Sequence, residues 1–235
     1  MSSSFIVIEG IDGSGIGTQV EALRTWCEDE RIPVYATKEP SDGPSGALLK
    51  LALEKRVDFT PSVMALLFAA DRLDHLEHHI EPRLAEGDNV VSDRYYLSSF
   101  AYQSEEVEFE WLRHLNFKCR RPDMTIFLDV PVATSLGRWE SDQWRALDRL
   151  QLYETEETLI GVRENYLQII GKLRDEGEEI AIVDGRGSIE AVQDEVLQAA
   201  APILRRSDAP NSLQRPPSTA TQEIKERLGL RRSAG

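Results

Sequence analysis

A glycine-rich turn after the first apolar run of the chain is the clearest candidate for chemistry. Residues 10–17 read GIDGSGIG, directly after the run 5–8 and before the amphipathic segment 18–30. Consecutive backbone N–H groups in such a turn, with the positive end of the following helix, form a site for phosphate oxygens. We therefore expect phosphate binding by the loop residues Gly10, Asp12, Gly13, Ser14, Gly15, Ile16, Gly17 and Thr18. The alternative is a plain tight turn, which glycines also serve.

The loop lacks the two side chains that usually do its chemistry. Its spacing is that of the phosphate-binding motif GxxxxGK[ST], but Ile16 replaces the lysine and Gly17 replaces the serine or threonine. In such loops the lysine contacts the terminal phosphates and the hydroxyl helps to hold Mg²⁺. Ile16 can do neither, and Thr18 would offer its hydroxyl from a different angle. The sequence thus predicts a phosphate site without its usual cation.

A second group of candidate residues lies in the string VSDRYYLSSFAYQ, residues 91–103. Asp93 and Arg94 follow an apolar run that we expect to be a strand. An aspartate at the carboxyl end of a strand, beside a phosphate loop, can organise Mg²⁺ and its waters. An adjacent arginine can bind a phosphate through two parallel hydrogen bonds. A surface ion pair at a helix end is the alternative for an isolated Asp-Arg pair.

The elements that must position these residues alternate along the chain. Short apolar runs predict buried parallel strands over residues 5–8, 34–37, 89–92, 125–128 and 180–183. Helical patterns cover residues 18–30, 62–86, 160–176 and 189–204, the second of them opened by Pro61. This alternation predicts an α/β fold, a doubly wound parallel five-stranded sheet flanked by helices.

Composition limits the class of protein. The 235 residues, 41% hydrophobic, suffice for one domain with a full core, which we place at residues 1–206. The net charge of −14 disfavours a nucleic-acid partner. No apolar run approaches the ~20 residues that span a bilayer, and no targeting segment is visible, so we expect no membrane partner. With only two cysteines, Cys27 and Cys119, we expect a reducing, cytoplasmic location.

The last part of the chain, residues 207–235, has a different composition. It is rich in serine, proline, alanine and glutamine, and it carries five basic against three acidic residues. This composition predicts a flexible tail, with a possible short basic helix over residues 222–231.

Taken together, the motifs resemble the thymidylate kinases, a family of P-loop nucleoside monophosphate kinases that phosphorylate dTMP with ATP. The string SDRYYLSSFAYQ resembles the family's signature, and FIVIEGIDGSG its first strand and loop. TKEPSDGPSG, ALLFAADRLDH, PDMTIFLDVP and ALDR followed by VRENYL resemble further family segments, in the family's order, over residues 5 to about 170. The loop departs from the family pattern at Ile16 and Gly17, and Lys38 stands where the family usually has arginine.

The resemblance implies an acceptor site for dTMP. Phe68 would stack on the thymine ring and Arg72 would hydrogen-bond its carbonyl edge. Arg94 would hold the phosphate, and Asp93 would act through Mg²⁺, with ATP as the donor. The other residues implied in dTMP binding are Asp12, Glu39, Ser98, Tyr102 against the deoxyribose and Gln103 near the base.

The resemblance also implies a mobile lid at about residues 138–153. This segment holds Arg138, Arg145 and Arg149, and lid arginines in the family can reach the transition state. We expect Arg145 and Arg149 to be catalytic and Arg138 to contact ATP, so that they substitute for the absent lysine. A homodimer is implied as well.

Three functions remain open at this point. The first is ATP-dependent phosphorylation of dTMP by an enzyme with a lysine-free loop. The second is a catalytically inactive nucleotide-binding sensor or partner module of the same fold, for which the changes at Ile16 and Gly17 argue. The third is a kinase that acts on another deoxynucleotide.

Overall fold

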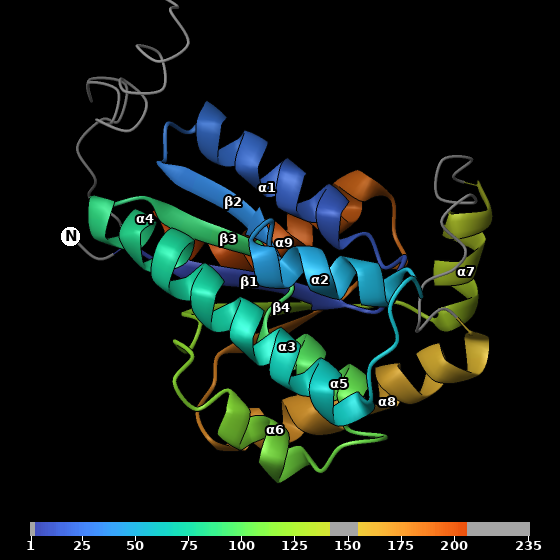
Figure 1. Cartoon of the computed structure of the whole chain (residues 1–235). Coiled ribbons are helices and arrows are strands. Elements are labelled where there is room, and N and C mark those ends of the chain that lie inside the picture. Colours follow the sequence, from blue (N-terminus) through green and yellow to red (C-terminus); the bar gives the residue numbers. More distant parts are fainter. Residues whose placement is uncertain (1–2, 142–154, 206–235) are drawn as a thin grey trace, which may run out of the picture.

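The computed structural model describes residues 3–141 and 155–205 of the chain. Over these residues the chain alternates between parallel strands and helices (Figure 1). The strands are β1 (Phe5–Gly10), β2 (Val34–Lys38), β3 (Asn89–Asp93), β4 (Met124–Asp129) and β5 (Ile180–Asp184). The helices are α1 (Ile16–Asp29), α2 (Pro44–Leu53), α3 (Pro61–His75), the π-helical turn η1 (Leu76–Ile80), α4 (Glu81–Glu86), α5 (Tyr96–Gln103), α6 (Phe109–Leu115), α7 (Val132–Ser141), α8 (Glu156–Asp175) and α9 (Ile189–Leu204).

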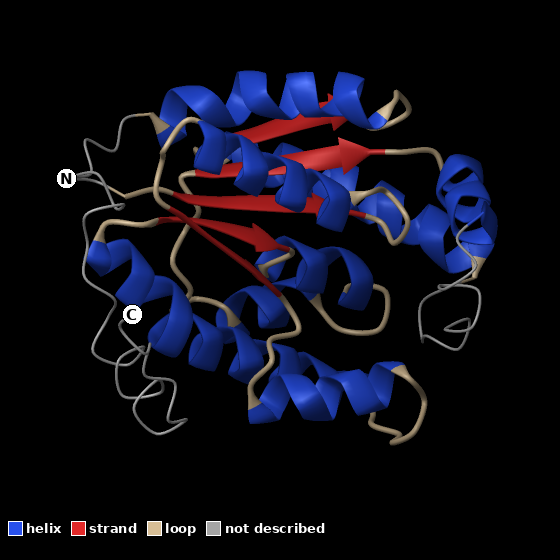
Figure 2. Cartoon of the chain, turned by 90° about the horizontal axis from the view of Figure 1, so that it is seen from above, coloured by secondary structure: helices blue, strands red, loops and turns tan. Residues whose placement is uncertain are grey.

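The strands form one parallel sheet in the order β2-β3-β1-β4-β5, with helices on both faces (Figure 2). The predicted fold class is therefore confirmed. All strand carboxyl ends lie at the same edge, and β1 pairs with β3 on one side and β4 on the other. The glycine loop after β1 thus lies beside the residues that follow β3. Ligands of open α/β sheets bind at this edge.

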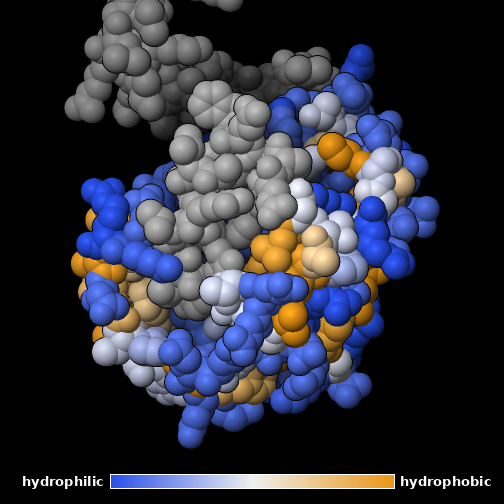
Figure 3. All heavy atoms as spheres, turned by 90° about the vertical axis from the view of Figure 1, so that its right-hand side faces the viewer, coloured by the Kyte–Doolittle hydropathy of each residue, from blue (hydrophilic) through white to orange (hydrophobic). Residues whose placement is uncertain are grey.

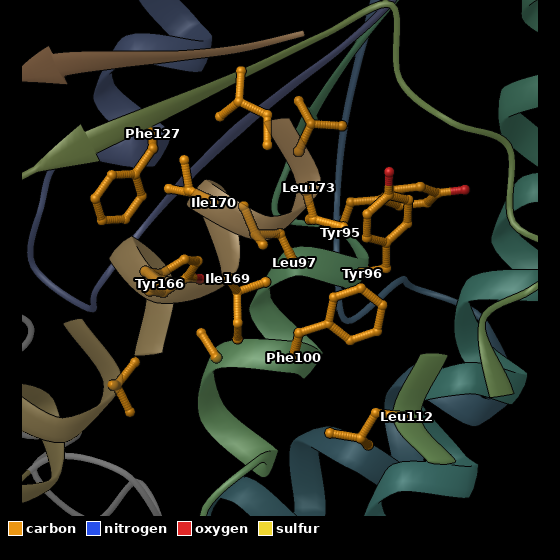
Figure 4. Close-up of a cluster of buried hydrophobic side chains, with 14 of the residues drawn as sticks. Tyr95, Tyr96, Leu97, Phe100, Leu112, Phe127, Tyr166, Ile169, Ile170 and Leu173 are labelled. Carbon is orange, nitrogen blue, oxygen red and sulfur yellow. The ribbon is translucent and has the colours of Figure 1, made fainter. Parts of the chain in front are cut away.

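The two faces of β1 build two separate cores. Phe5 and Val7 point to one face, where they join a cluster with α5 and α8. Ile6 and Ile8 point to the other, where they join a cluster with α1 and α9. Successive side chains of a strand alternate between faces, so one apolar run can fill both cores. Figure 4 shows the first core, in which Phe127 packs against Tyr166 and Phe100 packs against Tyr96.

The predicted elements are present, with one correction. Each strand extends one or two residues beyond its predicted range, and the helix predicted over 189–204 has those bounds. The helix expected over 62–86 is present as a continuous helical stretch from Pro61 to Glu86, but its middle turn, η1, is π-helical and not α-helical. Pro82 has no backbone N–H, and its ring would clash with the carbonyl of His78 in a regular α-helix. The helical turn before Pro82 is therefore wider than an α-helical turn.

Three short helices, α2, α6 and α7, were not predicted from the sequence. They have 10, 7 and 10 residues. Helices of this length are marginal in isolation, and their stability comes from the surfaces they pack against. A pattern within the segment alone therefore carries little signal.

Several predictions concern residues outside the described ranges. Arg145 and Arg149, most of the expected lid, the expected tail at 207–235 and the possible helix at 222–231 all lie there. They stay predictions. Among the described residues, no helix has the length and apolar character needed to cross a bilayer. Figure 3 shows that the face on the side of α7 is mainly hydrophilic, with separate hydrophobic patches.

The buried strand β1 offers a test of how the core stabilises the fold. Ile6 is 0% exposed, so Ile6→Ala should lower the free energy of unfolding by ~2–5 kcal/mol through lost burial and a cavity. The matched change Ile182→Ala in β5, at a side chain that is 42% exposed, should lower it by less than about 1 kcal/mol. Urea unfolding followed by circular dichroism measures both values. Equal losses would contradict the assignment of β1 to the centre of the core.

Candidate active site

The glycine loop joins β1 to α1 and leaves the start of α1 open. Gly15 precedes the helix with a φ of 100°, a left-handed conformation that suits glycine, and no side chain of the described residues caps the helix. The first N–H groups of α1, from Ile16 onward, therefore have no partner within the helix. Inside the loop the Ser14 N–H donates to the Ile11 carbonyl at 3.0 Å, so it is already used. The backbone N–H groups available to an anion therefore lie at the start of α1.

The side chain of Ile16 lies away from this site. It is 5% exposed and packs in the core between α1, α9 and the sheet. Among the atoms of Ile16, only the backbone N–H can serve an anion. Gly17 is exposed, and a Cβ at this position would lie 3.4 Å from Oδ2 of Asp93. The loop itself therefore brings no positive side chain to the start of the helix.

Two residues of helix α7 donate hydrogen bonds to the glycine loop. Arg138 donates from Nη1 to the Ser14 carbonyl at 3.0 Å and from Nη2 to the Gly185 carbonyl at 2.6 Å. Ser135 donates to the Asp12 carbonyl. Arg138 thus links the loop to the segment after β5, and its guanidinium lies close to the loop backbone.

A cleft on the β2 side of the loop is lined by a second positively charged side chain, that of Lys38. It has a volume of about 980 Å³, and Gly17, Lys38, His75 and Asp93 are among its lining residues. Lys38 ends β2 next to Asp93 in the sheet register, and it is exposed. An ammonium group therefore lies on the same side of the sheet as the open end of α1.

The structure gathers the residues predicted to bind dTMP around one pocket of about 650 Å³, a volume typical of small-molecule sites. They come from the glycine loop, the segments after β2 and β3, α3 and α5. The lining residues are Asp12, Glu39, Pro40, Leu53, Phe68, Arg72, Arg94, Tyr95, Ser98, Ser99, Tyr102 and Gln103. All eight predicted residues are on this side of the loop, while their roles in binding stay predictions.

Arg94 lies where the glycine loop meets the segment after β3. Its Nη1 donates to the Gly10 carbonyl at 2.9 Å and to Ser98 Oγ at 3.1 Å, and its Nη2 donates to Asp12 Oδ1 at 2.6 Å. Tyr102 donates to the other oxygen of Asp12 at 2.9 Å. The Nε–H of Arg94 makes no hydrogen bond with the described residues, and Nη2 makes a single one, to Asp12. A guanidinium binds phosphate through a pair of such neighbouring N–H groups.

Arg72 is held still more tightly, and it is 1% exposed. Nε donates to Glu39 at 2.8 Å and Nη1 donates to Asn116 at 2.6 Å. Nη2 donates to the Tyr95 carbonyl at 3.2 Å and to Ser99 at 2.9 Å. One N–H of Nη1 is left for a ligand, so the guanidinium can offer a single hydrogen bond of fixed direction.

Gln103 is the unusual polar group of the pocket. It is 4% exposed, and neither its amide oxygen nor its amide nitrogen has a partner among the described residues. A buried amide without hydrogen bonds is unfavourable by about 1–3 kcal/mol, and such groups are rare in folded proteins. Because Gln103 lines the pocket, a ligand with a donor and an acceptor side by side would satisfy it.

Asp93 fits the Mg²⁺ that the resemblance implies. Mg²⁺ is usually held by one or two carboxylates, substrate phosphates and several waters. The Asp93 carboxylate faces Gly17, at the start of α1, where phosphates would bind. The serine or threonine hydroxyl of the usual motif is missing there, and Thr18 is exposed, so a water would take that position. Among the described residues, no cluster of three or more His, Cys, Asp or Glu side chains could form a metal cage.

Glu9, which lies in β1 and is 0% exposed, was not predicted from the sequence. It accepts hydrogen bonds from Ser98 Oγ at 2.6 Å and from the Tyr166 hydroxyl at 3.0 Å. Burial raises the pKa of Glu9 from 4.5 to about 7, although the bond from Ser98, the charge of Arg94 and the bond from Tyr166 oppose this shift. An acidic residue inside an otherwise apolar strand was the available signal. Asn116, Tyr95, Ser99 and Leu53 were also missed.

The raised pKa of Glu9 predicts a pH-dependent stability. Between pH 4.5 and about 7 the folded state binds more protons at Glu9 than the unfolded state, so stability falls as pH rises. Glu9→Gln removes the titrating carboxyl group, so the variant does not share this loss. The free energy of unfolding of the variant minus that of the native chain should therefore rise by about 3 kcal/mol between pH 5 and pH 8. Urea unfolding at several pH values measures the difference. A difference independent of pH would contradict the shift.

The comparisons with known proteins agree with the geometry. Residues 8–196 match the sequence model of the family described as thymidylate kinase. A protein of Thermococcus kodakarensis named probable thymidylate kinase is 37% identical over 202 residues, 82% of this chain and 95% of that protein. Proteins of the same name from Pyrococcus horikoshii and Pyrobaculum calidifontis are 39% identical over 204 residues and 40% identical over 207 residues. These two alignments cover 84% and 86% of this chain, and 95% and 100% of the relatives. The chain therefore belongs to the thymidylate kinase family, the nucleoside monophosphate kinases that phosphorylate dTMP with ATP.

Proposed function

We propose that this chain transfers the γ-phosphoryl group of ATP to dTMP, giving dTDP and ADP, with cations outside the glycine loop in place of the missing lysine. The observation that carries the proposal is the acceptor pocket, where an aromatic ring, two held arginines and an unpaired buried amide meet. A fold that served only as a scaffold would have no physical need for such a set. Phosphoryl transfer depends mainly on positioning and on neutralising charge.

The base end of the pocket suits thymine. Phe68 offers a flat ring for stacking. The amide of Gln103 can accept from the N3–H of the base and donate to a neighbouring carbonyl. The remaining N–H of Arg72 can donate to a base carbonyl. A donor between two acceptors is the pattern of the thymine edge, whereas cytosine lacks the N3–H.

The phosphate end of the pocket suits a monophosphate. Arg94 would bind the acceptor phosphate with the edge formed by Nε and Nη2. Tyr102 lines the pocket and donates to Asp12, and its ring would pack against the sugar and disfavour a 2′-hydroxyl. Glu39 acts through Arg72, and Ser98 acts through Arg94. The open N–H groups at the start of α1 would hold the phosphates of ATP.

The metal ion would complete the phosphate site. Bound Mg²⁺ would neutralise part of the charge on the phosphates, and Asp93 would hold it together with water. Arg138 lies on the loop backbone, and it would contact the donor nucleotide. Lys38 lines a cleft together with Gly17, the second residue of α1. The arginines expected to reach the transferred phosphoryl group are Arg145 and Arg149, which follow α7 in the chain.

The alternative is a nucleotide-binding protein without catalytic activity, which acts as a sensor or partner module. The buried side chain of Ile16 and the bare Gly17 favour it, because together they remove a cation and a metal ligand from the loop. The complete acceptor pocket is expected in both cases. Turnover therefore decides between them, and nucleotide binding alone does not.

We propose a cytoplasmic homodimer as the form in which the chain works. The free thiols of Cys27 and Cys119 suit a reducing compartment. Val63 and Leu66 on α3 are 37% and 48% exposed, and they give this helix an apolar outer side that a second copy would cover.

The acceptor is tested by steady-state ADP formation with dTMP, and with dUMP, dCMP, dGMP and dAMP as competitors. We expect turnover with dTMP, and Gln103→Leu should raise the KM for dTMP by about 10–100-fold, because thymine then loses its amide partner. Gln193→Leu is the matched control, since Gln193 donates to the Ala22 carbonyl in α1 and is remote from the pocket. Stronger competition by another monophosphate would indicate that this nucleotide is the acceptor. Binding of dTMP without any turnover would favour the sensor.

The substitute cations are tested by Arg145→Met and Arg149→Met. At least one change should lower kcat by about 10³-fold while dTMP binding, measured by calorimetry, stays within twofold of the native value. Arg24→Met is the control, because Arg24 is paired with Glu21 and Glu28 on the exposed side of α1. If both variants keep the native kcat, neither Arg145 nor Arg149 replaces the lysine.

A further inference from the structure

Glu9, the last residue but one of β1, has no role in the proposed reaction. Oε1 of Glu9 accepts hydrogen bonds from the backbone N–H groups of Tyr95 and Ser98, at 2.9 Å and 3.2 Å. Oε2 accepts from Ser98 Oγ at 2.6 Å and from the Tyr166 hydroxyl at 3.0 Å. Four donors thus converge on one carboxylate that has no contact with solvent.

These donors belong to the start of α5 and to α8. Helix α5 begins at Tyr96, and none of its own side chains caps it. The carboxylate of Glu9 takes that role from a different element, and its negative charge suits the positive end of the helix. Tyr166 comes from α8, the helix that packs beside α5 in Figure 4. Glu9 therefore connects the central strand with two helices of one face of the sheet.

The same network reaches Arg94. Ser98 Oγ, which donates to Glu9, also accepts from Nη1 of Arg94 at 3.1 Å. The same Nη1 donates to the carbonyl of Gly10, the residue after Glu9. Arg94 has a φ of 70°, a left-handed backbone conformation that is uncommon for residues other than glycine and persists only where the surroundings fix it. The bonds at the start of α5 provide that fixation.

We propose that Glu9 is a positioning residue for Arg94: its carboxylate fixes Ser98 and the first turn of α5, so that the free edge of the guanidinium faces the acceptor phosphate. The inference rests on the proposed function, because it takes Arg94 as the group that binds the phosphate of dTMP. Glu9 itself touches neither substrate.

A purely structural role explains Glu9 less well. An apolar residue at this position would fill the core without the large unfavourable free energy of burying a carboxylate. The carboxylate is useful where an orientation must be fixed, since it accepts from several donors at once. One of those donors, Ser98, directly contacts the guanidinium that lines the pocket.

The test compares two ligands that differ only in the phosphate. Glu9→Gln keeps the size of the side chain and can still accept from the two N–H groups, but it removes the charge and replaces an acceptor by a donor toward Ser98. At pH 8 we expect the Kd of dTMP to rise about tenfold and that of thymidine to stay within twofold, both measured by calorimetry. The KM for ATP should also stay within twofold.

A matched control separates this role from a general effect on α5. Glu178 is another largely buried carboxylate, with a side chain 9% exposed, and it accepts from the Tyr96 hydroxyl at 2.8 Å. Glu178→Gln should leave the binding of both ligands unchanged. If Glu9→Gln does not fold, as judged by circular dichroism, Tyr166→Phe takes its place. That change removes one donor to the same carboxylate, and it should weaken dTMP binding selectively by about threefold.

The outcomes distinguish the two levels of the argument. Equal weakening of dTMP and thymidine, or no weakening of either, would overturn the role of Glu9 and leave dTMP as the acceptor. If the native chain binds neither ligand, the proposed acceptor fails, and the positioning role fails with it. Selective weakening of dTMP in Glu9→Gln, with Glu178→Gln unaffected, would support the proposal.

Discussion

The guanidinium of Arg94 ties together the two segments on which the site depends. It bonds the carbonyl of Gly10 and the carboxylate of Asp12 in the loop after β1, and Ser98 in the helix after β3. These segments come close because β1 and β3 are neighbours in a parallel sheet. A charged hydrogen bond in a partly buried place is strong and directional. The contact therefore fixes the pocket side of the glycine loop against the start of α5.

The polar groups of the pocket form two buried networks with different tasks. Arg72, Glu39 and Asn116 make a closed set in which the arginine keeps one N–H for a ligand. Arg94, Asp12 and Ser98 make a more open set, in which the arginine keeps a whole edge. Burying such charges is unfavourable unless their hydrogen bonds are satisfied, and here nearly all are. The groups left unpaired, above all the amide of Gln103, are therefore the polar groups of the pocket that are available to a ligand.

The changed glycine loop separates two properties that one motif normally combines. Backbone N–H groups at the start of α1 provide the phosphate site, and they depend on φ and ψ angles more than on side chains. The cation has been lost, because Ile16 turns into the core with α9. Any replacement must approach from outside the loop, and in the structure Arg138 and Lys38 flank the open helix end. Charge neutralisation depends on where a cation stands, and its origin in the chain is secondary.

The sequence by itself determined the alternation of strands and helices and the parallel sheet, because apolar runs and helical periodicity are local patterns. Most of the pocket residues followed from the resemblance to the thymidylate kinases, whose motifs are also local. Tertiary structure alone decided that Ile16 is buried, that Pro82 widens the long helix into a π-helical turn, and that Glu9 meets Ser98 and Tyr166. Glu9 and Tyr166 are 157 residues apart, and Arg72 and Asn116 are 44 apart. Contacts of this kind depend on how helices pack over the sheet, and no pattern within a single segment encodes that packing.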